Sequence, residues 1–266
     1  MIGIFYSKYD PASLNMAEYL KEEHGFAEKR VGGRLCFSDG KICLYEADKP
    51  LLEMESADEY GLSLACFLSK HSSAVGIAAF TTHPTGNWTR EARLGGKPYE
   101  LSYAAPLEML GILKNIKAKE VSGVELSYEA THHGPLLKTP SLFAEIGGNK
   151  ETIENKDYAK VVGEAVYAAL NGEGLEFSKI VIGIGNTHYP SKFSKLALER
   201  GFAFAHMMPK YAVEEEGKNL FMLEQAIKRS NKEVEAAIID GKSLNSNTRR
   251  MVISKLDELG IEYEKV

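Results

Sequence analysis

The chain has 266 residues, near the upper limit for one compact domain, and its hydrophobic fraction of 44% suffices for a sizeable core. A formal net charge of -5 excludes a protein that coats nucleic acid through bulk positive charge, because neutralising phosphates requires a basic surface. No apolar run comes near the roughly 18 residues of a membrane span, so we expect no membrane partner.

Apolar runs rich in β-forming residues alternate with helical patterns along most of the chain. This alternation predicts an α/β fold with a mixed, largely parallel sheet flanked by helices. The expected strands are 2–6, 35–37, 42–46, 62–68, 75–81, 121–128, 141–146, 179–184, 202–206, 234–239 and 261–264. The expected helices are 11–23, 103–117, 154–170, 191–200, 217–229 and 246–259.

Helix 11–23 has the clearest boundaries of these elements. Asp10 supplies an N-cap side chain, Pro11 fits the first helical turn, and Gly25 ends the helix after His24. A histidine at that end is favoured by the helix dipole, so we assign His24 a structural role. The apolar segment before Asp10 has no basic leader, and we interpret it as a first strand rather than a secretory signal.

No repeat or linker interrupts the pattern, which predicts a single domain over residues 1–266. The segment from Pro84 to Gly96 is rich in Gly, Thr and Arg and holds the only tryptophan, Trp88. We expect it to be a long, exposed and functional loop. The three cysteines form no Cys-x-x-Cys pair and lie in apolar segments, which is typical of reduced core cysteines in a cytoplasmic protein.

Histidines recur at the ends of the expected strands. Ligands of open parallel α/β sheets bind outside the carboxyl ends of the strands, so these side chains are candidates for one crevice. Strand order cannot be deduced from this sequence, and an antiparallel strand would carry its histidine to the opposite edge. The histidines concerned are His71, His83, His132, His133, His188 and His206.

The most distinctive motif is Thr-His-His-Gly-Pro at residues 131–135. Adjacent residues of a regular strand point to opposite faces, so His132 and His133 serve one centre only if the backbone has left strand geometry. The glycine and proline that follow favour such a departure.

Acidic residues accompany the histidines. Glu125 and Glu129 lie on the expected strand before the histidine pair, and Glu145 interrupts an apolar run, where a carboxylate is usually paired with a cation, a histidine or a metal. Histidine with carboxylate suits zinc, and a catalytic zinc site needs about three protein ligands and an open position for water. No His-Glu-x-x-His helix is present, so composition at the strand ends alone indicates the metal.

A glycine-containing turn follows the expected strand 179–184. Gly183 and Gly185 would bring backbone N–H groups close to an anionic group, just before a helix that begins near Pro190. The turn lacks the third glycine of a dinucleotide-binding fingerprint, which argues against an NAD enzyme.

Five motifs along the chain resemble the archaeal and plant type of D-aminoacyl-tRNA deacylase. They occur in the family's order, and the resemblance covers nearly the whole chain, up to Asp240-Gly-Lys-Ser-Leu. Asn186 and Ala205 depart from the pattern, since glycine is expected at both positions. The motifs are Ser69-Lys-His-Ser-Ser, Thr82-His-Pro-Thr-Gly-Asn87, Thr131-His-His-Gly-Pro135, Glu145-Ile-Gly-Gly and Gly185-Asn-Thr-His-Tyr-Pro190.

The resemblance implies a zinc-dependent cytoplasmic enzyme that hydrolyses the ester joining a D-amino acid to the 3′ end of tRNA. It also implies a fold similar to those of phosphorylases and peptidyl-tRNA hydrolases. D-aminoacyl-tRNA is then the partner, and we expect a monomer with no stable protein partner.

Site roles follow from the chemistry of the residues in these motifs. A zinc-bound hydroxide would attack the ester, His71 or one of the histidine pair would move the proton, and Lys70 or loop N–H groups would stabilise the oxyanion. The zinc candidates are His83, His132, His133, Glu145 and His188. The catalytic candidates are His71, Lys70, His132 and His133. The substrate-binding candidates are Gly134, Gly147, Gly183, Gly185, Tyr189 and His206.

Three alternatives remain open from the sequence. One is a metal-free hydrolase in which a histidine is the base and the terminal ribose hydroxyl assists. Another is a non-catalytic RNA-binding module in which histidines and Tyr189 grip a single-stranded 3′ end. The third is a nucleoside or peptide hydrolase on a similar fold.

Overall fold

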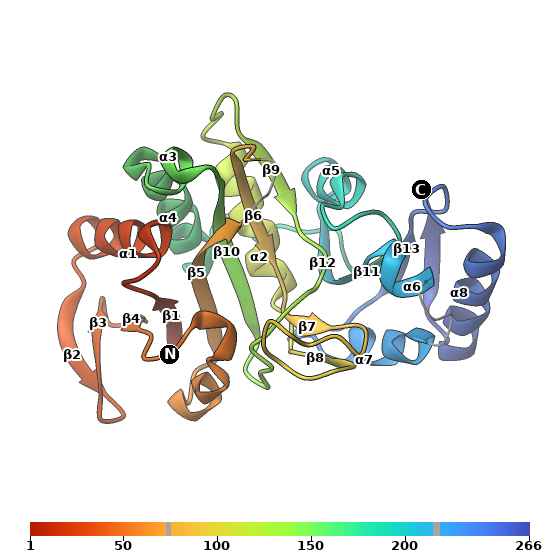
Figure 1. Cartoon of the computed structure of the whole chain (residues 1–266), viewed down its shortest axis with the longest axis horizontal. Coiled ribbons are helices and arrows are strands. Elements are labelled where there is room, and N and C mark those ends of the chain that lie inside the picture. The colour runs from red at the N-terminus through yellow and green to blue at the C-terminus, as the bar shows by residue number, and fades with distance from the viewer. Residues whose placement is uncertain (73–75, 215–218) are drawn as a thin grey trace.

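Figure 1 shows the computed structural model of the chain, which describes residues 1–72, 76–214 and 219–266. Eight strands form the larger sheet: β1 (Ile2–Tyr6), β2 (Ala27–Val31), β3 (Arg34–Ser38), β4 (Ile42–Glu46), β5 (Leu64–Ser72), β6 (Ala79–His83), β9 (Glu125–Tyr128) and β10 (Ser141–Gly148). Their order is β2-β3-β4-β1-β5-β10-β6-β9. The pairings of β1 with β4 and β5, of β5 with β10 and of β6 with β9 are parallel, and the other three are antiparallel.

A smaller sheet lies at the other end of the molecule. Its strands are β11 (Lys179–Ile184), β12 (Phe202–Met208), β13 (Ala236–Ile239) and β14 (Glu262–Lys265), and all of its pairings between described residues are parallel. Their order is β12-β11-β13-β14. Two short strands, β7 (Gly86–Asn87) and β8 (Glu100–Leu101), pair with each other between the sheets.

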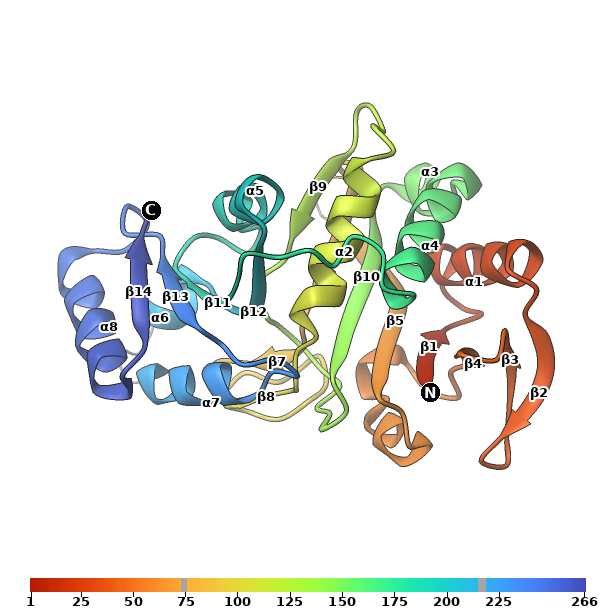
Figure 2. The same cartoon turned by 180° about the vertical axis from the view of Figure 1, so that it is seen from behind.

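One face of the larger sheet is covered by helices. The α-helices of the described residues are α1 (Pro11–Glu23), α2 (Pro106–Lys117), α3 (Lys150–Ile153), α4 (Lys156–Leu170), α5 (Ser191–Arg200), α6 (Lys210–Glu214), α7 (Met222–Lys228) and α8 (Ser246–Leu259). Figure 2 shows α1, α2 and α4 side by side on this face. Helix α2 also packs against β12, and one apolar core runs through both sheets.

The opposite face of the larger sheet is covered differently. Alternate residues of a strand point to opposite faces, so Leu142 and Ala144 pack under the helices while Phe143 and Glu145 point away from them. Instead of long helices, short 3₁₀ turns at Leu51–Glu53 and Glu55–Tyr60 cover part of this second face. The second face is therefore accessible in part, and it carries the site described below.

The predicted α/β class with a mixed, largely parallel sheet is confirmed, but the strands are divided between two main sheets. Most predicted elements are present with shifted ends. Helix α1 has the predicted bounds, and Asp10 caps it by accepting hydrogen bonds from Ala12 and Ser13. Strand β2 was not predicted because it is exposed and lacks apolar alternation. Residue 75 of the predicted strand 75–81 and residues 217 and 218 of the predicted helix 217–229 lie outside the described residues.

The prediction of an exposed loop from Pro84 to Gly96 was wrong for its first part. Trp88, which directly follows β7, is buried in the apolar core, and only the part from Arg90 onward is largely exposed. The three cysteines are buried and free, as predicted. No helix among the described residues is long and apolar enough to cross a membrane.

Candidate active site

Three neighbouring strands place polar residues on the second face of the larger sheet. Glu145 is central on β10, next to β5 on one side and β6 on the other. His71 of β5 lies opposite Gly147, and His83 of β6 lies opposite Phe143. Because Phe143, Glu145 and Gly147 are two residues apart, the side chains of His71, His83 and Glu145 share one face.

This arrangement corrects the prediction of a crevice outside the carboxyl ends of parallel strands. Strand β6 is antiparallel to β10, so its carboxyl end at His83 lies beside Phe143, near the start of β10. The site therefore lies on the face of the sheet, over three strands, rather than along one edge.

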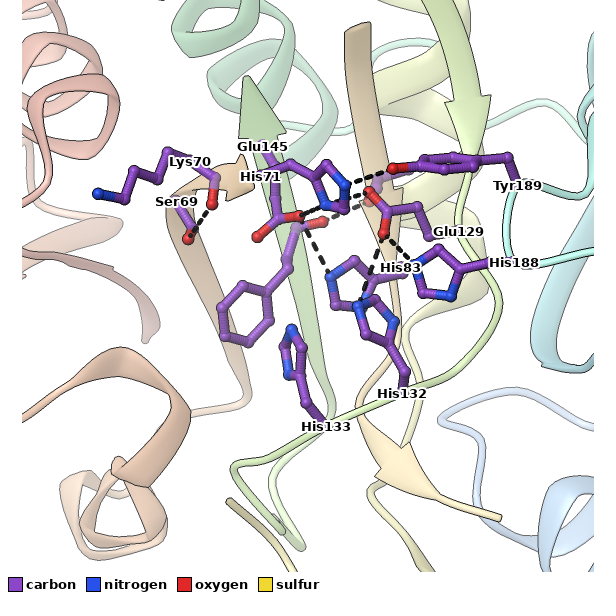
Figure 3. Close-up of polar contacts among 12 residues, drawn as sticks. Ser69, Lys70, His71, His83, Glu129, His132, His133, Glu145, His188 and Tyr189 are labelled. Atoms are coloured by element: carbon purple, nitrogen blue, oxygen red, sulfur yellow. Dashed lines mark hydrogen bonds and ion pairs between the residues drawn. The ribbon is translucent and has the colours of Figure 1, made fainter. Parts of the chain in front are cut away.

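The segment that follows β9 brings three further residues to this face: Glu129, His132 and His133 (Figure 3). Its backbone is tied to both sheets, because the Glu129 N–H donates to Thr82 O of β6 and the Thr131 N–H donates to Met207 O of β12. The φ angle of His133 is 44°, outside strand geometry. Both imidazoles of the pair consequently point into one cluster, with ring centroids 4.3 Å apart.

Three imidazoles are oriented by backbone carbonyls. The Nδ1 atom of His132 is 2.8 Å from Ala130 O, that of His133 is 2.6 Å from Gly134 O, and that of His83 is 3.2 Å from Pro84 O. A protonated Nδ1 that donates to a carbonyl leaves Nε2 with a free lone pair. One ring nitrogen from each histidine lies within 4.8 Å of those of the other two. The site therefore holds a convergent set of three imidazole donors.

Two buried carboxylates lie beside these imidazoles. Glu129 Oε2 is 3.0 Å from His188 Nε2 and 3.6 Å from His132 Nε2, and Glu129 Oε1 is 3.1 Å from His71 Nδ1. Glu145 Oε2 is 3.4 Å from His71 Nδ1 and 3.6 Å from His83 Nε2. The hydroxyl group of Tyr189 contacts His71 Nε2. Both ring nitrogens of His71 therefore have a polar partner, and Glu129 contacts three histidines, His71, His132 and His188.

Burial and neighbouring charges shift the pKa values of these groups in opposite directions. Burial alone would lower the pKa of His71, but its contacts with Glu129 and Glu145 raise that pKa to about 10. Burial and the nearby His83 imidazole lower the pKa of His133 to about 4 and hold that of His132 well below its usual range. Burial opposes ionisation of Glu129, but hydrogen bonds with His188 and His71 lower its pKa well below the usual range. The histidine pair is thus neutral at pH 7, as metal ligands must be.

Two cavities open on either side of His132 and His133. The larger, of about 780 Å³, extends over the ends of β1, β4 and β5 and reaches Glu145 and His188. The smaller, of about 400 Å³, lies on the side of β7 and α6. His132, His133 and Leu94 line both cavities. Any molecule that occupied both would pass over the histidine pair.

The structure brings most of the sequence-predicted polar residues together. His71, His83, His132, His133, Glu145, His188 and Tyr189 all belong to the cluster in Figure 3. Lys70 does not: its side chain is exposed and points away from the histidines, because it alternates with His71 along β5. Lys70 contributes only to the rim of the larger cavity, so the structure does not place its ammonium beside the cluster.

The predicted glycines have packing roles. A Cβ on Gly134 would lie 2.6 Å from Leu52 O, and one on Gly147 would lie 3.2 Å from His71 Cβ, so both allow close approach beside the cluster. Gly183 lies against the Phe193 ring instead, inside the core of the smaller sheet. Gly185 lies against Ser243, at the carboxyl end of β11. Gly183 and Gly185 thus pack against residues other than the histidines of the cluster.

His206 lies in a different environment from the other predicted histidines. It is fully buried in β12, its Nδ1 atom is 3.2 Å from Thr131 Oγ1, and its Nε2 atom is 2.9 Å from Arg229 O. These contacts use both ring nitrogens inside the protein. The structure thus gives His206 a packing role, in contrast to the substrate contact expected from the sequence.

Two features of the site were missed from the sequence. The sequence pattern does not distinguish Glu129 from Glu125, although Glu129 is fully buried at the centre of the cluster and Glu125 is exposed. Trp88 was placed in an exposed loop, although it lines the smaller cavity. A signal for Glu129 exists in the sequence: it lies three residues before His132, at the end of a strand.

Neutral imidazoles, a charged imidazole and buried carboxylates on a rigid α/β scaffold define a hydrolytic type of enzyme site. A family model described as D-aminoacyl-tRNA deacylase matches residues 59–264. The chain is 35% identical over 275 residues to the D-aminoacyl-tRNA deacylase of Pyrococcus furiosus and 36% identical over 271 residues to that of Thermococcus onnurineus, with 98% of each chain covered in both cases. The chain belongs to the D-aminoacyl-tRNA deacylase family.

A solved structure has the same fold. The crystal structure of a conserved protein of unknown function, AF0625, matches with a TM-score of 0.91 and 31% identity, covering 100% of this chain and 95% of that one. Asn186, which stands where the family resemblance led us to expect glycine, has a φ angle of 70°. Asparagine tolerates this left-handed region better than most residues, so the departure preserves the turn.

Proposed function

We propose that this protein hydrolyses the ester bond between a D-amino acid and the 3′ end of tRNA, and that it uses zinc held by His83, His132 and His133. Membership of the deacylase family supports the substrate class. The observation that carries the zinc assignment is the convergence of three imidazole donors within 4.8 Å of one another.

The residues present fit a zinc ion. His83 Nε2 is buried and makes no hydrogen bond to any residue that the structure describes, since its contact with Glu145 Oε2 is 3.6 Å long. An unsatisfied buried group is costly unless a further group satisfies it. The Nδ1 contacts of all three histidines with backbone carbonyls are the outer interactions that orient metal-binding imidazoles. Zinc at such a site supplies a Lewis acid and lowers the pKa of bound water to about 7.

The carboxylates and the remaining imidazoles act around that centre. Glu129, 3.0 Å from His188 Nε2, accepts at Oε2 the proton that the attacking water loses, and passes it to Nε2 of His188, whose side chain is 32% exposed. His188 then delivers the proton to the departing ribose oxygen. Glu145 lies between His71 and His83 and fixes both rings. Tyr189 holds His71 from the solvent side, so we assign His71 a positioning role.

Incubation of the protein with D-tyrosyl-tRNA and L-tyrosyl-tRNA, with and without a chelator, tests this proposal. We expect loss of the D ester only, abolished by chelation and restored by zinc, and about one zinc per chain by elemental analysis. Equal hydrolysis of both enantiomers, or of neither, would reject the deacylase. Full activity in demetallated protein would reject zinc and favour the metal-free mechanism.

We further propose that the protein works in the cytoplasm as a monomer. Its buried, unpaired thiols suit a reducing compartment. The second reason for a cytoplasmic location is the proposed substrate, an aminoacylated tRNA. Sedimentation at several protein concentrations measures the oligomeric state.

A further inference from the structure

The two cavities differ in the chemistry of their walls. The larger cavity has an apolar part lined by Ala47, Pro50, Leu51 and Leu52. Its charged lining residues have both signs: the carboxylates Asp10, Asp48 and Glu145, and the ammonium groups of Lys49 and Lys70. Such a wall suits an apolar side chain next to a positively charged amino group.

The smaller cavity has the features of a nucleotide site. Tyr211, at the start of α6, is 49% exposed and offers an aromatic ring for stacking, which every base accepts. Arg93 has a side chain that is 87% exposed, and its pair with Glu91 engages Nε, at 2.9 Å. A guanidinium in the wall of a cavity suits phosphate recognition.

A buried donor in the same wall is unsatisfied. Trp88 is 3% exposed, and its Nε1 makes no hydrogen bond to any residue that the structure describes. An indole N–H is a donor only, and such groups are normally paired when buried. A hydroxyl group or ring nitrogen of a nucleoside would accept this hydrogen bond.

We infer that the smaller cavity binds the 3′-terminal nucleotide of the tRNA, while the larger cavity binds the aminoacyl group. The residues shared by the two cavities are the strongest support for this assignment. Both cavities meet at His132 and His133, so an ester that linked the nucleotide in one cavity to the aminoacyl group in the other would lie over the proposed zinc ligands. Both volumes fall within the range of about 300–1,000 Å³ that is usual for ligand sites. This inference rests on the proposed function.

The fluorescence of Trp88 offers a direct test, because it is the only tryptophan in the chain. Titration with adenosine 5′-monophosphate should change its emission to saturation, whereas ribose 5-phosphate, which lacks a base, should bind at least fivefold more weakly. Tyr211→Ala should weaken binding of adenosine 5′-monophosphate at least fivefold, the loss expected for one base–aromatic stack. Tyr9→Ala is the matched control, since Tyr9 is an exposed tyrosine of the larger cavity, and it should leave this affinity unchanged.

Kinetics with the full substrate give a second readout. Tyr211→Ala should raise KM for D-tyrosyl-tRNA with kcat nearly unchanged. Arg93→Ala should weaken the binding of adenosine 5′-monophosphate but not the binding of adenosine. An unchanged Trp88 emission, or a loss of nucleotide affinity in Tyr9→Ala but not in Tyr211→Ala, would overturn the assignment.

Failure of the inference is distinguishable from failure of the proposed function. Nucleotide binding at Trp88 without any D-tyrosyl-tRNA hydrolysis would reject the function and leave the nucleotide site. Hydrolysis of D-tyrosyl-tRNA that is insensitive to Tyr211→Ala and to adenosine 5′-monophosphate would reject the nucleotide site and leave the proposed function.

Discussion

The imidazole of His83 stacks face to face on the phenyl ring of Phe143, with ring centroids 5.2 Å apart and ring planes inclined by 12°. Phe143 stacks in turn on Phe67, and Phe67 on Phe5, so a ladder of rings crosses neighbouring strands and ends at the site. Stacked aromatic pairs stabilise one ring orientation. The ladder thus fixes the ring plane of His83, a proposed zinc ligand, from the neighbouring strand.

Phe143→Leu should loosen His83 and weaken zinc binding by about 10–100-fold, the usual effect of removing a group that orients a ligand. Competition with a fluorescent chelator measures the zinc affinity. Phe5→Leu is the matched control, because Phe5 is equally buried in the same ladder but does not touch His83. Both variants should lose about 1–2 kcal/mol in the free energy of unfolding, as core substitutions do. Equal zinc affinity in both variants would contradict the positioning role.

Glu129→Gln should reduce the rate of ester hydrolysis at least 100-fold while circular dichroism stays unchanged, because the amide keeps the shape but does not accept a proton. Glu125→Gln changes an exposed residue of β9, the strand that ends just before Glu129, and should have no effect. Single-turnover rates on D-tyrosyl-tRNA compare the two. A Glu129→Gln enzyme with near-normal rate would exclude the proposed proton transfer to His188.

The stability of the fold should depend on the neutral form of His206. Burial lowers the pKa of His206 to about 4, below the ordinary value of 6.5. A group whose pKa is lower in the folded than in the unfolded state contributes stability above pH 6.5 and loses that contribution as the pH falls toward 4. The contribution of His206 to the free energy of unfolding is about 3 kcal/mol in total, of which about 2 kcal/mol is lost between pH 7 and pH 5.

Urea unfolding of wild type and His206→Gln at both pH values measures this contribution. The variant should be less stable at pH 7 but should lose about 2 kcal/mol less on acidification. Parallel losses in the two proteins would show that His206 does not titrate as described.

Gly134→Ala should displace the histidine pair. Its new Cβ would lie 2.6 Å from Leu52 O and would also collide with the backbone of Gly95 and Gly96. We expect a loss of about 1–3 kcal/mol in stability, as for overpacking, together with weakened zinc binding. Gly241→Ala is the control, since a Cβ there meets only Arg249, at 3.5 Å. Retention of normal zinc affinity by Gly134→Ala would show that the close approach of Gly134 to Leu52, Gly95 and Gly96 does not hold His133 in place.

The sequence allowed the helices and most strands to be predicted, because caps and apolar periodicity are local. Helix α1 shows this best: Asp10, Pro11 and Gly25 mark its ends without reference to any other part of the chain. The departure of His132 and His133 from strand geometry was also predictable, because a glycine and a proline follow them.

The direction of β6 was not predictable, and it decides where the site lies. An apolar run that ends in histidine describes both His83 and His206, yet one faces the cluster and the other is enclosed in the smaller sheet. The same limit applies to Glu125 and Glu129, since only the pairing of β9 and the turn after it bury one of them. Long-range strand pairing, which no local pattern encodes, makes these distinctions.

The hydrogen bonds of Thr131 have a consequence for how the enzyme fails. Its amide donates to Met207 O and its hydroxyl oxygen accepts from the Met207 amide, while the next two residues are the site histidines. Separation of β12 from this segment would therefore weaken the hold on the histidines even if every strand of the larger sheet stayed paired, because it leaves them held by contacts such as that from the Gly86 N–H to His133 O. Deuterium uptake at these two amides should rise together with loss of activity on warming, ahead of uptake in β5 and β10, so that the join between the sheets sets the working temperature of the enzyme.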